Sequence, residues 1–249
     1  MFRVLLIWLL AFSFAFGYID EDLDGVDDSV DKCPGTPFDV LVNADGCPLE
    51  ESGKFYIKLS ASYSLDEGES SLTSYITVSY SNTNWYFSVT GSYLLDADES
   101  KNEVGDTYLF GSYILNWKNL YTQLGLNIKI PTSKVSKKID YTPSILVDMY
   151  LNSIDVFLYG DYTFTNEEGL KNSYNLSVGI GNQFTYRFYL STSFDYSQSN
   201  VSGYDDEQYI SIYAIYDFTE KFFASILYSY GLNKSAIDHN IFGKIGYRF

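Results

Sequence analysis

The chain has 249 residues and a formal net charge of -16, because 32 Asp and Glu stand against 16 Lys and Arg. Phosphate binding needs clustered Lys and Arg, so this composition excludes nucleic acid as a partner. After the first seventeen residues, polar or charged residues interrupt every apolar stretch. A helical membrane protein is therefore excluded, because a spanning helix needs about 20 consecutive apolar residues.

Residues 1–17, MFRVLLIWLLAFSFAFG, have the composition of a secretory signal. Arg3 precedes an apolar run, and small residues, Ala15 and Gly17, stand at the positions that a signal peptidase inspects. An uncleaved anchor is the alternative, but the run from 4 to 18 is shorter than a spanning helix. The sequence predicts cleavage after 17 and a mature chain that acts outside the cytoplasm.

The mature chain opens on an acidic stretch with the spacing D-x-D-x-D-G-x-x-D-x-x-D. Calcium takes six to eight oxygen ligands, and this spacing offers carboxylates at loop positions 1, 3, 5, 9 and 12. Gly25 stands at the sharp turn, and Val26 offers a backbone carbonyl at position 7. The pattern predicts a Ca²⁺ site rather than a disordered acidic linker. The ligands that this pattern predicts are Asp20, Asp22, Asp24, Val26, Asp28 and Asp31.

Cys33 and Cys47 are the two cysteines of the chain, and both follow the predicted signal. In an exported protein they are expected to form a disulfide. Closing a loop of about 15 residues stabilises the fold by roughly 3 kcal/mol in chain-entropy models. We expect the bond to hold together a segment that is too small to form a hydrophobic core of its own.

The acidic spacing and the following KCPGTPFDVLVNADGCP together resemble the thrombospondin type 3 repeat over residues 19–49. The resemblance implies a chain that wraps calcium ions with almost no hydrophobic core. Asn43 and Asp45 look like a truncated second ligand set, which leaves one ion or two open. Residues 18–50 hold ten acids against Lys32, a net charge of -9, which a bound cation would offset.

From residue 53 to the last residue, apolar and polar residues alternate with period two, which indicates strands whose two faces meet different surroundings. The connectors between these runs are alternately short and long. Five are tight, around 82–83, 117–118, 152–153, 183–184 and 219–220, and six are mostly longer and polar, beginning with 66–72. The twelve predicted strands are 54–65, 73–81, 85–95, 106–116, 119–131, 140–151, 154–165, 172–182, 185–196, 206–216, 220–231 and 238–249.

Alternating short turns and long loops with an even strand count are typical of a transmembrane β-barrel. A soluble barrel or sandwich is the alternative, because period two alone does not tell inside from outside. Trp85 and Trp117 fall at predicted periplasmic turns, with Tyr186, Tyr216 and Phe222, as an interfacial girdle would. The predicted fold is all-β, a twelve-stranded antiparallel outer-membrane barrel over 53–249, preceded by an irregular calcium-binding, disulfide-stapled segment over 18–50.

The closing residues, GKIGYRF, resemble the insertion signal of bacterial outer-membrane barrels, which implies that the barrel-assembly machinery recognises Phe249. The stretch LGLNIKIPTS, residues 124–133, resembles a motif of barrels associated with uptake of aromatic or hydrophobic compounds. Both resemblances point to the bacterial outer membrane. The predicted lipid-covered barrel has both ends, and therefore the calcium segment, in the periplasm.

Alternation also predicts which charged side chains line the lumen. Mixed charge among small residues suits a narrow pore for small solutes, and equally a lumen closed by its own ion pairs. His239 has no serine at a catalytic spacing, so no enzyme is predicted. The alternative function is a non-transporting envelope anchor or adhesion protein that binds envelope components through the calcium segment or outer loops. The predicted luminal charges are Lys58, Lys129, Asp148, Asp155, Asp161, Arg187, Asp195, Lys244 and Arg248.

Overall fold

The computed structural model describes residues 20, 22, 24–36, 42–47, 53–95, 103–151 and 154–249. The predicted signal and the connector at 152–153 lie outside the described residues. None of the described residues belongs to a helix long and apolar enough to cross a membrane.

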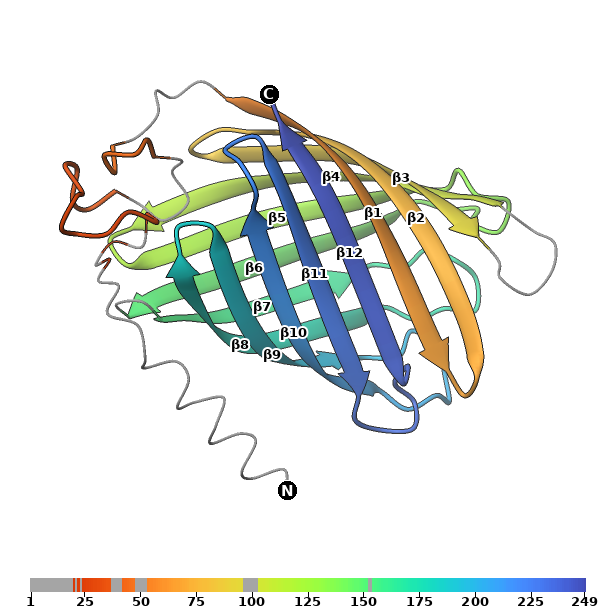
Figure 1. Ribbon diagram of the computed structural model, residues 1–249. Helices are drawn as coiled ribbons and strands as arrows, with labels where there is room; N and C mark the ends of the chain where they lie inside the picture. Colours follow the sequence, from red (N-terminus) through yellow and green to blue (C-terminus); the bar gives the residue numbers. More distant parts are fainter. Residues whose placement is uncertain are drawn as a thin grey trace.

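Twelve antiparallel strands form a closed barrel, in which each strand pairs with its neighbours in the chain and β1 pairs with β12 (Figure 1). The predicted number of strands and their closure are therefore confirmed. The strands are β1 (Lys54–Asp66), β2 (Glu69–Ser81), β3 (Trp85–Leu95), β4 (Glu103–Trp117), β5 (Leu120–Ile130), β6 (Asp140–Leu151), β7 (Ile154–Thr163), β8 (Ser173–Thr185), β9 (Phe188–Ser197), β10 (Glu207–Asp217), β11 (Phe222–Gly231) and β12 (His239–Arg248).

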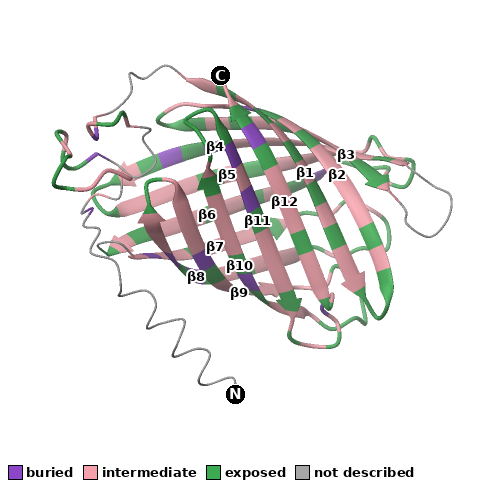
Figure 2. Ribbon diagram, in the orientation of Figure 1, coloured by how far each residue is buried: buried purple, intermediate pink, exposed green. Residues whose placement is uncertain are grey.

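The barrel has its apolar face outside. Leu124 and Leu126 of β5 and their counterparts on the other strands are exposed, and exposed residues alternate with less exposed ones along parts of the strands (Figure 2). Within the described residues, the buried hydrophobic side chains are Ile114, Phe223 and Ala236. A soluble protein would bury its apolar face, so this surface requires a lipid environment.

Three aromatic rings lie flat against the inner wall because glycine stands beside each of them. Phe157 pairs with Gly179 and Phe223 with Gly246, and a Cβ on either glycine would overlap the ring. Gly125 gives Phe110 the same room. Glycine in a strand often marks such a close approach, and here it keeps bulky rings out of the lumen axis.

The connectors after β2, β4, β8 and β10 lie at one end of the barrel, together with the start of β1 and the end of β12 (Figure 1). We call this the turn end and the opposite one the loop end. The five aromatic residues predicted as a girdle are exposed at the turn end: Trp85, Trp117, Tyr186, Tyr216 and Phe222. Phe249 is also exposed there, and its N–H donates to the Phe55 carbonyl.

Two predicted connectors differ from the structure. The charged stretch 66–72 is not a long loop, because β1 and β2 continue to a two-residue turn at Glu67 and Gly68, both with positive φ. The turn predicted at 183–184 lies at Tyr186 and Arg187, after a register shift between Gln183 and Thr185. Arg187, predicted to line the lumen, therefore lies in a turn with its guanidinium over the Tyr186 ring.

Candidate functional site

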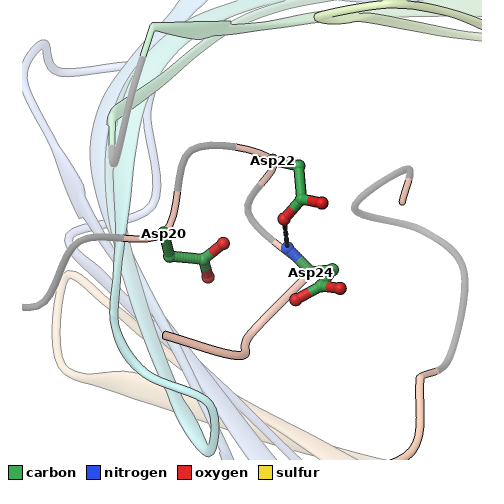
Figure 3. A group of neighbouring side chains, drawn as sticks. All are labelled: Asp20, Asp22 and Asp24. Atoms are coloured by element: carbon green, nitrogen blue, oxygen red, sulfur yellow. Dashed lines mark hydrogen bonds between the residues drawn. The ribbon is translucent and has the colours of Figure 1, made fainter. Parts of the chain in front are cut away.

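The carboxylates of Asp20, Asp22 and Asp24 come together in the acidic segment, which comprises the described residues from 20 to 47. One oxygen from each lies within 4.8 Å of the others, and Figure 3 shows the Asp20 carboxylate pointing toward the other two. Backbone bonds fix this arrangement: Gly25 N–H donates to Asp20 Oδ2 over 3.0 Å and Val26 N–H to Asp24 Oδ1 over 2.9 Å. The predicted spacing thus brings three of its carboxylates into one group.

The disulfide loop holds this group from the other side. Cys33 and Cys47 are bonded, as predicted, with their Cα atoms 4.9 Å apart. Asp22 Oδ2 accepts hydrogen bonds from Gly35 N–H and Thr36 N–H, which ties the two parts of the segment together. The buried Thr36 hydroxyl lies 2.8 Å from the Cys33 carbonyl oxygen and 3.0 Å from that of Gly46.

Asp31 approaches the three-carboxylate group at Gly46. The φ of Gly46 is 74°, and a Cβ there would overlap the Asp31 carboxylate and lie 3.3 Å from Asp24 Oδ2. That Oδ2 is buried and has no hydrogen-bond partner among the described residues. Carboxylate oxygens of Asp24 and Asp31 therefore border a space beside Gly46, and the side chain of any larger residue at position 46 would fill it.

Burial makes the charge in this group costly. Loss of water, together with the neighbouring carboxylates, raises the pKa of Asp20 to about 7 and that of Asp24 to about 6. Ionising both groups at neutral pH therefore opposes this packing. A divalent cation among them would supply the missing opposite charge.

The other predicted ligands are placed differently. Asp28 is exposed. Asn43 Oδ1 accepts from Asp45 N–H and Cys47 N–H, at 2.9 and 3.1 Å. Asp45 forms an ion pair with Lys32 at 2.8 Å. The structure therefore does not bring Asn43 or Asp45 into the group that Asp20, Asp22 and Asp24 form.

The acidic segment meets the barrel at the turn between β8 and β9. A Cβ on Gly25 would lie 3.5 Å from the Tyr186 Cα, so the Asp-rich turn packs against this hairpin. Sequence reasoning did not identify Thr36 or Tyr186 as parts of this site. A single threonine and a turn tyrosine carry no spacing that could have indicated their contacts.

The lumen is lined by polar side chains with a few charges, as alternation predicted. Some charges form ion pairs: Lys129 Nζ lies 2.6 Å from Asp140 near the loop end, and Arg248 lies 2.7 Å from Asp217 near the turn end. Other charges contact tyrosines. Lys58 Nζ lies 3.0 Å from the Tyr86 hydroxyl.

Luminal carboxylates accept hydrogen bonds from tyrosine hydroxyls. Tyr150 donates to Asp148 over 3.1 Å, Tyr159 to Asp161 over 2.8 Å, and Tyr189 to Asp155 over 2.7 Å. Another carboxylate, Asp195, borders a cavity of about 340 Å³ and accepts from the hydroxyls of Ser193 and Ser211. The inner wall therefore presents carboxylates, hydroxyls and ammonium groups to the lumen.

His239 has no catalytic surroundings in the described part of the chain. It lies on the outward-facing register of β12, and its Nδ1 is 2.8 Å from the Tyr228 hydroxyl. Its ring also packs against Tyr230 with centroids 5.5 Å apart. The structure thus places His239 between two tyrosines. The absence of enzyme activity stays a prediction.

Comparisons with known proteins agree with this architecture. No protein-family model matches the chain. A stretch of 29 residues is 66% identical to outer membrane porin F of Pseudomonas aeruginosa, and it represents 12% of this chain and 8% of that protein. This match is too short to carry the whole relative's properties to this chain.

Solved structures match the barrel itself. An outer-membrane channel from Pseudomonas putida F1 matches with a TM-score of 0.58 and 13% identity, over 79% of this chain and 94% of that one. The KdgM porin matches with 0.59 and 10% identity, over 77% and 99%. The NanC porin matches with 0.57 and 12% identity, over 78% and 98%. At these identities the likeness shows the fold, and the fold is that of outer-membrane porins and channels.

Proposed function

We propose that this protein is an outer-membrane channel for small solutes, with a calcium-binding segment at its turn end. The observation that most directly supports a channel function is the arrangement of the barrel, in which an apolar outer surface surrounds a polar lumen with charged side chains. Such a polar lining interacts favourably with water and polar solutes only if they enter the lumen. The apolar surface supports a location in the bacterial outer membrane, and the turn end is proposed to face the periplasm.

Twelve strands favour a narrow pore. Eight-stranded barrels are filled by their own side chains, whereas barrels of about 16 to 18 strands enclose a wide aqueous channel. The glycines under Phe157, Phe223 and Phe110 support an open lumen, because they let the three rings lie against the wall. The named relatives with this fold are porins and a channel.

Conductance in planar lipid bilayers tests the channel. The folded mature chain is expected to insert and to give discrete current steps, because the charged lumen admits hydrated ions. Liposomes that contain the protein should also swell in a neutral sugar of low mass and not in a large one. Inserted protein that gives no current and no swelling would overturn the channel and favour the non-transporting anchor or adhesion role.

The residues present fit a calcium ion. Carboxylate oxygens are the ligands that Ca²⁺ prefers; Asp20, Asp22 and Asp24 supply them in one group, and the Asp31 carboxylate lies beside Asp24 at Gly46. The buried Asp24 Oδ2 without a hydrogen-bond partner supports the fit most directly. A bound ion would neutralise the group and hold the Asp-rich turn against the disulfide loop.

Limited proteolysis tests the calcium site in the full mature chain in detergent. With calcium chloride, residues 20–47 should resist cleavage, and EDTA should expose them while the barrel stays intact. Asp24→Asn should weaken calcium binding by about tenfold or more, because it removes a charged ligand. Asp45→Asn is the matched control, since Asp45 pairs with Lys32 outside the group. Identical cleavage in calcium and in EDTA would overturn the site.

A further inference from the structure

Two pairs of like charges stand in the lumen without an ion-pair partner. Lys58 on β1 pairs in register with Gly246, so Lys244 of β12 is its diagonal neighbour. On the other side, Asp148 of β6 pairs in register with Phe157, so Asp155 of β7 is its diagonal neighbour. Within the described residues, none of these four side chains lies within 4.0 Å of an opposite charge.

The two pairs face each other across the barrel. The strands form a closed ring of twelve, so the β12–β1 boundary is opposite the β6–β7 boundary. Figure 1 shows β1 and β12 on the near wall and β6 and β7 on the far wall. All four residues have the inward register of their strands, alternating with exposed apolar neighbours such as Leu59.

Strand register also places the pairs at a similar level along the barrel axis. Because strands tilt by about 35–45°, hydrogen-bonded partners climb toward the loop end from strand to strand. The row of partners that starts at Lys58 crosses five strands and ends at Asp140 on β6, and over that distance it rises by about the length of six strand residues. The residue of β6 that lies at the same level as Lys58 is therefore about six residues further along the chain than Asp140. That position is about two residues from Asp148. The partners of Lys58 on β2 to β6 are, in order, Thr77, Thr90, Tyr108, Lys129 and Asp140.

Tyrosines hold three of the charges in place. The Lys58 ammonium contacts Tyr86, while Tyr150 and Tyr189 bind Asp148 and Asp155. Asp148 Oδ1 is buried and has no hydrogen-bond partner among the described residues. This oxygen can accept a further donor from the lumen.

We propose that this level of the lumen selects small zwitterions, solutes that carry both an ammonium and a carboxylate group. The carboxylate would turn toward Lys58 and Lys244 and the ammonium toward Asp148 and Asp155. The opposed walls create a field across the pore, which low-dielectric surroundings strengthen. A zwitterion gains at both walls at once, whereas a neutral solute gains at neither. The inference rests on the proposed channel function and names its solute class.

Liposome swelling with 6-aminohexanoate, a flexible zwitterion, and erythritol, a neutral solute of similar mass, tests the proposal. The native protein should pass the zwitterion faster than erythritol. In Lys58→Gln/Lys244→Gln and in Asp148→Asn/Asp155→Asn, the ratio of the two rates should fall about threefold or more, toward one. A ratio near one in the native protein, or one that both variants leave unchanged, overturns the selectivity. Absence of swelling in erythritol overturns the channel instead.

Two further variants test whether the field across the pore, rather than the loss of charge alone, determines the ratio of the two swelling rates. Lys129→Gln/Asp140→Asn removes a pair that is already neutral, with atoms 2.6 Å apart, so the ratio should not change. Exchanging the walls in a variant with Lys58→Asp, Lys244→Asp, Asp148→Lys and Asp155→Lys reverses the field and should preserve the preference, because a free zwitterion can turn round. Loss of preference in the exchanged variant, when erythritol still passes, contradicts the proposal.

Discussion

Glycines on the inner wall act by leaving room for a neighbouring ring. Gly179 shows this most directly, because Phe157 on the paired strand lies over its Cα. Gly179→Ala should lower the free energy of unfolding by about 1–3 kcal/mol, since either the ring or the backbone must move. Conductance should fall as well if the ring swings into the lumen. Urea unfolding in lipid vesicles and single-channel recording measure the two effects.

The ring itself provides the control for this substitution. In a Phe157→Ala background the added methyl group meets no ring, so Gly179→Ala should then change stability by no more than about 0.5 kcal/mol. Gly243→Ala is a second control, because a Cβ at Gly243 meets nothing within 4 Å. An equal cost of Gly179→Ala with and without Phe157 would show that backbone entropy, rather than ring contact, requires glycine.

At the scale of elements, the β1–β2 hairpin departs most from its prediction. Both strands have 13 residues, more than the about 9–11 that cross a bilayer, so the hairpin projects beyond the hydrocarbon. Outside the lipid both faces meet water, and residues 66 and 69–72 continue the ladder up to the turn. The sequence resembles a loop there because alternation is lost, although hydrogen bonding is not.

The turn of this hairpin requires two residues that tolerate positive φ. Glu67 and Gly68 have φ of 48° and 90°, the signs that a two-residue type I′ turn requires. Gly68→Ala should lower the free energy of unfolding by about 1–2 kcal/mol, because alanine is strained at positive φ. Glu67→Asn should instead be neutral or stabilising, since asparagine suits such turns. Equal urea midpoints for the native chain and Gly68→Ala would refute the type I′ requirement.

The three-carboxylate group and the luminal charges differ in how far sequence alone could predict them. Asp20, Asp22 and Asp24 are close in the chain, so their spacing predicted their meeting. The contacts of Gly35 and Thr36 with Asp22 depend on how the disulfide loop folds back, which spacing does not encode. Alternation predicted that Lys58 and Asp148 point inward. That they face each other depends on ring closure and shear, which are properties of the whole barrel.

The whole molecule depends on one orientation, with apolar side chains toward lipid and polar ones toward the lumen. Adjacent positions on β8 test it, because Val178 is 50% exposed on the outer face and the neighbouring Ser177 faces inward. Val178→Arg should lower the free energy of unfolding in lipid vesicles by about 2–4 kcal/mol, since it puts a charge in hydrocarbon. Ser177→Arg should cost under about 1 kcal/mol and instead alter ion selectivity.

Tryptophan fluorescence can report both unfolding transitions, because Trp85 and Trp117 lie at the turn end, away from the middle of β8. The two arginines differ by one position in the chain, so strand propensity and added charge are matched between them. Only the surroundings of the two faces distinguish them. If Ser177→Arg proved the more damaging, the polar face would be the one that packs tightly, and the proposed water-filled lumen would have to be abandoned.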